Sequence, residues 1–222
     1  TYVVDNDSDV VRETNADSVT GGNDLVESSV SYTLSANVEK LTLTGTAVIN
    51  ATGNALDNTL VGNASANSLD GGVGIDSLIG GDGNDTIGGG NGADTIDGGN
   101  GHDLIAGYGG NDSLIGGAGN DSISAGGADD TMMGGAGNDL YMIAGMENGR
   151  IIDSGGSDTV SMFGLGAETT SALAGDLSAG SGIEAINLAG TGHRLGLTAA
   201  SVVTLSDTDV LRVFGSGADR VV

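Results

Sequence analysis

The sequence predicts an all-β protein: a right-handed, parallel β-helical solenoid (a β-roll) of glycine-rich nonapeptide repeats, flanked by further β-strand segments. Composition is the first observation, because 43 of the 222 residues are glycine, proline and cysteine are absent, and only 3% are aromatic. The second is a repeat, since residues 53–142 divide into ten consecutive nonapeptides. The third is that the eighth position of every nonapeptide is Leu, Ile, Met or Tyr. A disordered glycine-rich linker lacks such regular spacing, so we expect an ordered repeat fold.

The nonapeptides also set the expected domain boundaries. These are an N-terminal β flank at 1–52, the repeat block at 53–142, a second β flank at 143–192 that resembles 1–47, and a β-rich tail of unknown role at 193–222. The flanks are related because SANVEKLTLTGTA (35–47) and GSGIEAINLAGTG (180–192) share a Glu after an aliphatic residue and a closing Gly-Thr. The chain begins with neither an initiator methionine nor a signal peptide, so we expect it to be a piece of a longer protein.

Each nonapeptide joins a glycine-rich turn to a short strand. Glycine adopts positive φ without steric cost, which suits the first six positions to a turn. The last three positions suffice for a short strand with its central side chain inward. Two nonapeptides then form one coil of 18 residues, and stacked coils bring parallel strands about 4.8 Å apart. The inward side chains should form two facing columns, Leu60, Leu78, Ile96, Leu114 and Met132 in one and Leu69, Ile87, Ile105, Ile123 and Tyr141 in the other.

The sixth position of the repeats carries the candidate metal ligands. They lie on two edges, Asp76, Asp94, Asp112 and Asp130 on one and Asp85, Asp103, Asp121 and Asp139 on the other. Carboxylates stacked roughly 5 Å apart repel by about 3 kcal/mol per pair at an effective dielectric constant near 20. The block contains thirteen Asp and no Lys or Arg, so the chain itself cannot offset this repulsion.

A divalent cation between the coils would turn this repulsion into attraction. Only oxygen ligands are available in quantity, which favours Ca²⁺ or Mg²⁺ over Zn²⁺ or Cu²⁺. Calcium accepts backbone carbonyls and flexible geometry more readily than magnesium does. We therefore expect several Ca²⁺ ions. The alternative, turn-forming aspartates without a metal, leaves the repulsion between carboxylates unanswered.

The repeating pattern GGxGxDxUx resembles the RTX (repeats-in-toxin, hemolysin-type) calcium-binding proteins, and eight of the ten repeats carry its Asp. The resemblance implies a β-roll in which repeats n and n+2 share each calcium. The implied pairs are Asp76/Asp94, Asp85/Asp103, Asp94/Asp112, Asp103/Asp121, Asp112/Asp130 and Asp121/Asp139. Implied backbone ligands are the carbonyls of Gly72, Gly74, Gly81, Gly83, Gly90, Gly92, Gly99, Gly101, Gly117, Gly119, Gly135 and Gly137.

Several repeats depart from the family pattern. Asn58 and Asn67 replace the Asp in the first two repeats and carry no charge, so metal sites that use them should be weak or empty. Tyr108, Ala125 and Ala128 stand where the pattern has glycine. The site that pairs Asp112 with Asp130 is therefore a less regular one.

Charge and motifs exclude several functions. The formal charge of −24 disfavours nucleic acid and anionic lipid as partners. No run of 18 apolar residues could form a transmembrane helix. The two histidines lie in turns, where His102 and His193 should be exposed to solvent. With no nucleophile beside either of them, we do not expect this chain to be an enzyme, although a catalytic domain elsewhere in the full-length protein stays open.

Two functional hypotheses remain. The first is a calcium-binding structural module of a large secreted or cell-surface RTX protein, an adhesin or surface-layer component. The resemblance implies that it leaves a Gram-negative bacterium by type I secretion and folds on Ca²⁺ outside the cell. The second is the secretion and folding domain of an exported RTX enzyme (protease, lipase or epimerase) or cytolysin. Self-association or surface assembly through open strand edges is a further possibility.

Overall fold

The computed structural model describes residues 1–14, 22–144, 150–152, 155–163, 183–188, 194–195, 212–215 and 220–221. Regular structure in these residues consists of β-strands and no helix, so no helix there is long and apolar enough to cross a membrane. The strands before the repeats and up to their first coil are β1 (Tyr2–Val4), β2 (Leu25–Ser28), β3 (Tyr32–Thr33), β4 (Lys40–Leu43), β5 (Ala51–Thr52), β6 (Thr59–Val61) and β7 (Ser68–Val73). Those that follow within the repeats are β8 (Ser77–Asp82), β9 (Thr86–Asn91), β10 (Thr95–Asn100), β11 (Leu104–Gly109), β12 (Ser113–Ala118), β13 (Ser122–Gly127), β14 (Thr131–Ala136) and β15 (Leu140–Ala144). Beyond them lie β16 (Arg150–Ile152), β17 (Asp158–Phe163), β18 (Ile183–Leu188), β19 (Arg194–Leu195), β20 (Arg212–Gly215) and β21 (Arg220–Val221).

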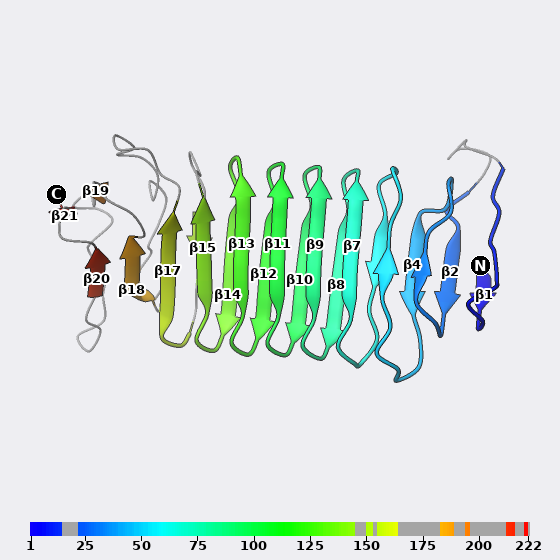
Figure 1. Ribbon diagram of the computed structural model, residues 1–222, viewed down its shortest axis with the longest axis horizontal. Helices are drawn as coiled ribbons and strands as arrows, with labels where there is room; N and C mark the ends of the chain where they lie inside the picture. Colours follow the sequence, from blue (N-terminus) through cyan, green and yellow to red (C-terminus); the bar gives the residue numbers. More distant parts are fainter. Residues whose placement is uncertain are drawn as a thin grey trace.

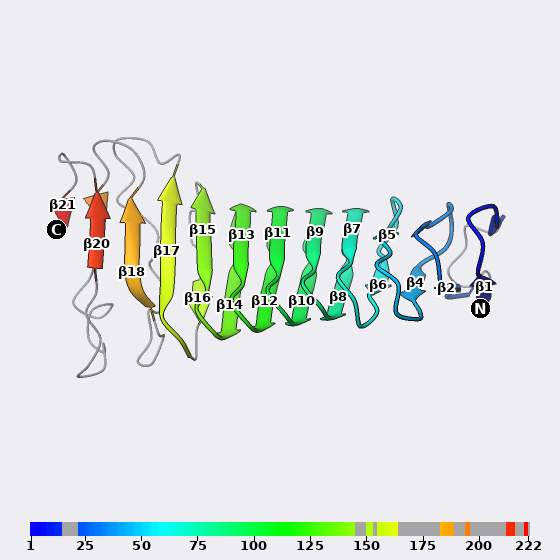
Figure 2. The ribbon, with the colours of Figure 1, turned by 60° about the horizontal axis from the view of Figure 1, so that its bottom comes forward.

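The strands stack into a β-solenoid of about seven turns, which confirms the predicted fold class. One sheet has the order β1-β2-β4-β6-β8-β10-β12-β14-β16, and the other has the order β20-β18-β17-β15-β13-β11-β9-β7-β5-β3. Strands β19 and β21 pair separately. Neighbouring strands are parallel and come from successive coils, as Figures 1 and 2 show. Flank strands such as β2, β4 and β17 therefore belong to the same two sheets as the repeats.

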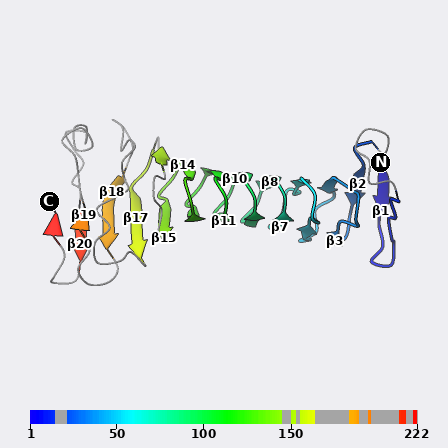
Figure 3. The ribbon, with the colours of Figure 1, turned by 90° about the horizontal axis from the view of Figure 1, so that it is seen from above.

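The predicted inward columns form the core between the sheets. Leu78, Ile96 and Leu114 are aligned in one sheet, because β8, β10 and β12 pair in register with an offset of 18 residues. Ile87 and Ile105 are aligned in the same way in the other sheet. All ten predicted inward residues are at most 1% exposed. Complete burial of such an aliphatic side chain contributes about 1.5–3 kcal/mol. Figure 3 shows the strands of the two sheets as two rows.

The strands within the repeats are longer than the sequence indicated. Strands β8 to β14 each have six residues, so they run from the seventh position of one repeat to the third position of the next. The expected strand of three residues is only the first half of each. Glycines enter the sheets because pairing continues through them, for example Gly81 with Gly99. The turns are correspondingly short, and they place the aspartates at the two edges of the solenoid.

Candidate metal centre

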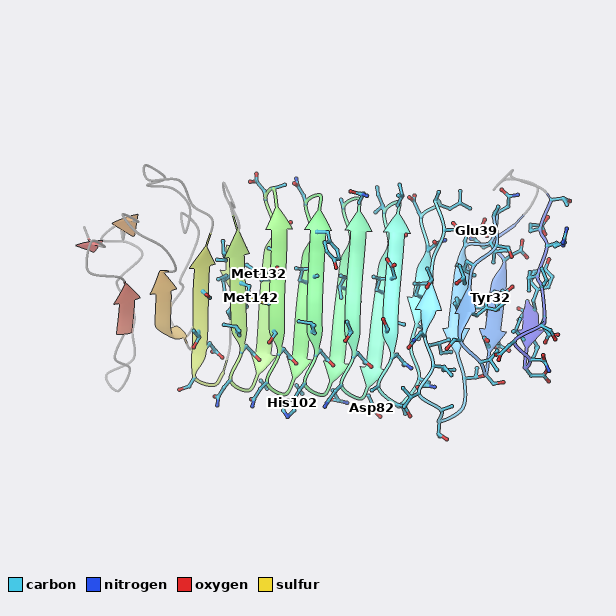
Figure 4. The ribbon with its side chains drawn as sticks, viewed as in Figure 1. Tyr32, Glu39, Asp82, His102, Met132 and Met142 are labelled. Atoms are coloured by element: carbon cyan, nitrogen blue, oxygen red, sulfur yellow. The ribbon has the colours of Figure 1, made fainter. Side chains whose placement is uncertain are left out.

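The eight predicted aspartates lie in the turns and are buried, with exposed fractions of 1–3%. Each of them immediately precedes a strand, so strand register fixes its height in the stack. Figure 4 shows the edge that carries Asp82 and His102, where the turns of the even-numbered repeats follow one another. Buried, ionisable carboxyl groups require either hydrogen bonds or a counter-charge.

One oxygen of each carboxyl group is satisfied by the preceding coil. The backbone N–H of Asp76 donates to Oδ1 of Asp94, at 2.8 Å, and the N–H of Asp85 donates to Oδ1 of Asp103, at 2.8 Å. The same bond, at 2.7–2.9 Å, recurs along both edges. The structure thus brings together every predicted pair of aspartates. Their joint binding of a metal stays a prediction.

The second carboxyl oxygen has a different environment. Within the described residues, Oδ2 is buried without a hydrogen-bond partner in Asp76, Asp85, Asp94, Asp103, Asp112, Asp121 and Asp130. A buried carboxylate oxygen without a donor is costly unless a cation compensates it. This arrangement is repeated in seven consecutive repeats, so it is a systematic property of the turns.

A backbone carbonyl lies close to this oxygen in Asp76, Asp85, Asp94, Asp103, Asp112 and Asp121. The point where a Cβ would stand on Gly98 is 2.5 Å from Oδ2 of Asp103 and 2.6 Å from the carbonyl oxygen of Gly116. At Gly71 the corresponding distances are 2.6 Å to Asp76 and 2.5 Å to the Gly89 oxygen. Two oxygens therefore face one small space that any side chain on the first glycine would fill. An all-oxygen donor set of carboxylate and carbonyl suits Ca²⁺.

These first-position carbonyls were missed by the sequence analysis. They belong to Gly89, Gly98, Gly107, Gly116, Ala125 and Gly134. A signal was present, because nine of the ten repeats begin with glycine. The close approach of a carboxyl oxygen and a carbonyl oxygen to the first glycine explains that preference. Backbone conformation does not, since no positive φ is found at Gly71 or Gly98. The predicted carbonyls at the second and fourth positions instead face the glycine at the same position of the next coil, as Gly83 faces Gly101. Their role as ligands stays a prediction.

Burial also changes the acidity of the aspartates. It raises the pKa from 3.8 to about 6 in Asp76, Asp85, Asp121 and Asp130, although the N–H bond from the preceding coil opposes the shift. Burial raises the pKa of Asp94, Asp103 and Asp112 as well. The charged form is disfavoured because it loses its hydration. A bound cation would act in the opposite direction and favour the carboxylate.

No group of three or more His, Cys, Asp or Glu side chains gathers within the described residues. The candidate sites therefore depend on one or two carboxylates each, completed by carbonyl oxygens. This agrees with the arrangement of the sixth-position aspartates, which form a ladder with one carboxyl group per coil along each edge.

Asn58 and Asn67 occupy the same buried position as the aspartates but are satisfied by protein groups. Oδ1 of Asn58 accepts the N–H of Asn54 at 2.7 Å, and Nδ2 of Asn67 donates to the carbonyl of Ile49 at 2.6 Å. An amide nitrogen cannot bind a cation, so one of the two side-chain atoms is lost as a ligand. Weak or empty sites at these positions stay a prediction.

Asp158 extends one edge beyond the repeats and was not predicted. It is fully buried, and its Oδ1 accepts the N–H of Asp139 at 2.7 Å. The interval is 19 residues instead of 18, which removed it from the nonapeptide register. The signal was the segment GSDTV at 156–160, which resembles GNDTI at 83–87.

The irregular repeats adapt locally. Tyr108 and Ala128 have φ of 70° and 92°, the left-handed region that glycine adopts more easily. Ala125 begins its repeat and is fully buried. It is in register with Gly107, where a Cβ would meet Oδ2 of Asp112. By equivalence, we expect the Ala125 methyl group to lie beside the carboxyl group of Asp130.

His102 is exposed, as predicted, and its Nδ1 accepts the N–H of Asn120 at 2.7 Å. It thus takes part in an outer ladder of turn side chains, in which the N–H of His102 also donates to Asn84 at 2.9 Å. His193 and most of the tail at 193–222 lie outside the described residues.

Comparison with known proteins agrees with this geometry. The family model of the RTX calcium-binding nonapeptide repeat (4 copies) matches residues 52–87, 70–105 and 106–141. No curated protein matches the chain, and no solved structure does. The matched residues include all eight predicted aspartates, whose buried carboxyl groups recur every nine positions.

Proposed function

Because residues 52–141 are RTX calcium-binding nonapeptide repeats, we propose that the chain is a calcium-dependent structural module of a large secreted or cell-surface protein, of the adhesin or surface-layer type. The observation that carries this proposal is the row of buried Oδ2 atoms without a donor in seven aspartates. Calcium ions between the coils would supply the missing positive charge. The likeness to RTX calcium-binding repeats supports calcium as the ion, and the oxygen-only surroundings agree with it.

The chain's own residues explain why folding would depend on the ion. Packing the coils together removes the carboxyl groups from water and places like charges one coil apart. Without a cation to compensate them, both effects oppose the favourable free energy of burying the aliphatic columns. A site that exists only in the stacked state makes binding free energy part of folding free energy. The block would therefore remain unfolded where calcium is scarce and fold where calcium reaches about 10⁻³ M, which suits sites of the weak extracellular class.

This behaviour fits export through a narrow channel followed by folding outside the cell. RTX proteins are typically secreted or surface-exposed, which supports an extracellular location and type I secretion from a Gram-negative bacterium. The solenoid also continues beyond the repeats, since β2, β4 and β17 join the same sheets. A continuous rod supports the role of a structural spacer. Its terminal strands offer edges through which copies could associate.

The rival role is the secretion and folding domain of an exported enzyme or cytolysin. The repeats would behave identically in that case, so the full reading frame discriminates between the two. Many further repeats would favour the structural protein, and an upstream catalytic domain would favour the enzyme.

Calcium dependence itself is tested by far-ultraviolet circular dichroism of the whole chain. We expect largely disordered repeats in chelator and a cooperative gain of β-structure on adding calcium, with a weaker response to magnesium as the matched control. A repeat block that is fully folded in chelator at neutral pH would refute the proposal.

A further inference from the structure

The first two repeats contain a set of hydrogen bonds that the later repeats lack. Asn58 lies at the position of the ladder aspartates and is 2% exposed. Its Oδ1 accepts the N–H of Asn54 at 2.7 Å. Its Nδ2 lies 3.4 Å from the carbonyl oxygens of both Val38 and Glu39, one coil earlier. The amide thus spans two coils with a donor on one side and an acceptor on the other.

Asn67 repeats this arrangement on the opposite edge. Its Oδ1 accepts the N–H of Asn63 at 2.8 Å, and its Nδ2 donates to the carbonyl of Ile49 at 2.6 Å. In the repeats of Asp76 to Asp121, Oδ2 of the aspartate takes the place of this Oδ1, beside the first-position glycine and the carbonyl of the next coil, and it has no hydrogen-bond donor within the described residues. The amide carries no charge, its oxygen has a donor and its nitrogen has an acceptor, so the buried group is satisfied without an ion.

Two further asparagines strengthen the same coils. Asn54 stands where the repeat pattern has its second glycine, and its Nδ2 donates to the carbonyls of Ser35 and Val38 at 2.8 and 2.7 Å. Asn63 occupies the equivalent position on the other edge and donates to Ala47 at 2.9 Å. Each of these carbonyls belongs to the N-terminal flank. The flank and the first coil are therefore joined by side-chain amides on both edges.

In the part of the chain that the structure describes, buried carboxyl groups first appear at the boundary between the second and third repeats, after residue 70. Among residues 53–70 the acidic side chains are Asp57 and Asp70, and both are exposed. From Asp76 onward, each repeat buries a carboxyl group. Burial of acidic groups therefore opposes folding after this boundary and not before it.

We propose that residues 25–69, here called the asparagine cap, fold without calcium and act as the template on which the calcium-dependent coils stack. The cap presents two backbone donors to the first aspartates, because the N–H of Asn58 donates to Asp76 and the N–H of Asn67 donates to Asp85, both at 2.7 Å. The first carboxyl group on each edge therefore meets an ordered partner before an ion binds. Ordering a first coil is the costly step in building a repeat stack, and a preformed end lowers that cost.

This inference rests on the proposed function, and hydrogen exchange of the whole chain separates the two. In chelator at neutral pH, we expect amides of the cap to exchange at least about tenfold more slowly than those of residues 76–142. Calcium should then protect residues 76–142. A cap as unprotected as the repeats in chelator would overturn the inference alone, whereas repeats already protected in chelator would overturn the proposed function.

The double substitution Asn58→Asp and Asn67→Asp tests whether the two side-chain amides are the reason that the cap folds without calcium. It replaces the two buried donors with carboxylate oxygens and should abolish protection of the cap in chelator. It should also raise the calcium concentration needed to protect residues 76–142. Asn50→Asp is the matched control, because Asn50 is exposed and its Oδ1, which accepts the N–H of Ser68 at 3.0 Å, is retained. An unchanged cap in the double variant would overturn the role of the amides. Exchange of the unsubstituted chain decides the proposal even if the double variant does not fold.

Discussion

Adding a single methyl group to a first-position glycine should close one candidate calcium site. Gly98 is the best position, because its Cβ would lie 2.5 Å from Oδ2 of Asp103 and 2.6 Å from the carbonyl oxygen of Gly116. Ordinary contacts of a Cβ begin at 3.4 Å, so these oxygens must retreat by about 0.8–0.9 Å. The φ angle of Gly98 lies outside the left-handed region, and Gly98→Ala therefore adds volume without backbone strain.

Overpacking of this kind costs about 1–3 kcal/mol. If the cost falls on the calcium-bound state, it corresponds to a weakening of about 5- to 150-fold at that site. The assay is isothermal titration with calcium, together with the calcium midpoint from circular dichroism. Gly127→Ala is the control, because a Cβ at Gly127 meets no atom within 4 Å. Equal numbers of bound ions and equal midpoints in the two variants would refute this account of the site.

Three further predictions concern the same edges and core. Ala125→Gly removes the natural methyl group beside Asp130 and should tighten calcium binding by up to about tenfold, measured by titration; a weaker affinity would contradict the steric reasoning. In chelator, the raised pKa values of about 6 mean that protonated carboxyl groups favour the folded state. Stability of the calcium-free solenoid should therefore be greatest near pH 4 and should be lost as the pH rises through 6, while calcium affinity should fall as the pH drops below 6. Circular dichroism across this range checks both trends, and a calcium-free fold that is more stable at pH 7 than at pH 4 would reverse the sign. Ile105→Ala empties a fully buried position in one inward column and should destabilise the calcium-bound protein by about 2–5 kcal/mol in urea unfolding, whereas Leu104→Ala, at a 46% exposed neighbour, should cost far less.

The sequence was sufficient for the architecture because one period governs it. An interval of 18 residues returns the chain to the same place on the next coil, so residues such as Ile87 and Ile105 had to align if the strands were parallel. The same interval brought Asp85 beside Asp103. Hydrophobic spacing and acidic spacing led to the same register, and the buried columns and the carboxyl ladder both follow from it.

The 18-residue period did not predict which backbone carbonyl oxygens face the carboxyl groups. It gives the position of a turn but not which carbonyl faces inward, so the oxygens of Gly98 and Gly116 were missed while those of Gly83 and Gly101 were expected. Strand length was also underestimated, since glycine has no intrinsic preference for strands and enters them here only because the neighbouring coils do. Asp158 was missed because a 19-residue interval breaks the period while keeping the contact.

A comparison of the asparagine repeats with the aspartate repeats shows what the carboxyl groups change. Asn67 and Asp85 occupy equivalent turns on one edge. Oδ1 of Asn67 accepts the N–H of Asn63 in its own coil, whereas Oδ1 of Asp85 accepts the N–H of Asn67 in the preceding coil. The other atom of Asn67, Nδ2, donates to Ile49, whereas the other oxygen of Asp85, Oδ2, lies beside the first-position glycine and the next-coil carbonyl without a hydrogen-bond partner. An asparagine ladder would therefore be enough to hold such coils together, and aspartate is the inferior choice for a protein that only needs to be folded. Aspartate in eight consecutive repeats is accounted for if folding is required to wait for an ion, with asparagine retained at the end where the stack has to begin.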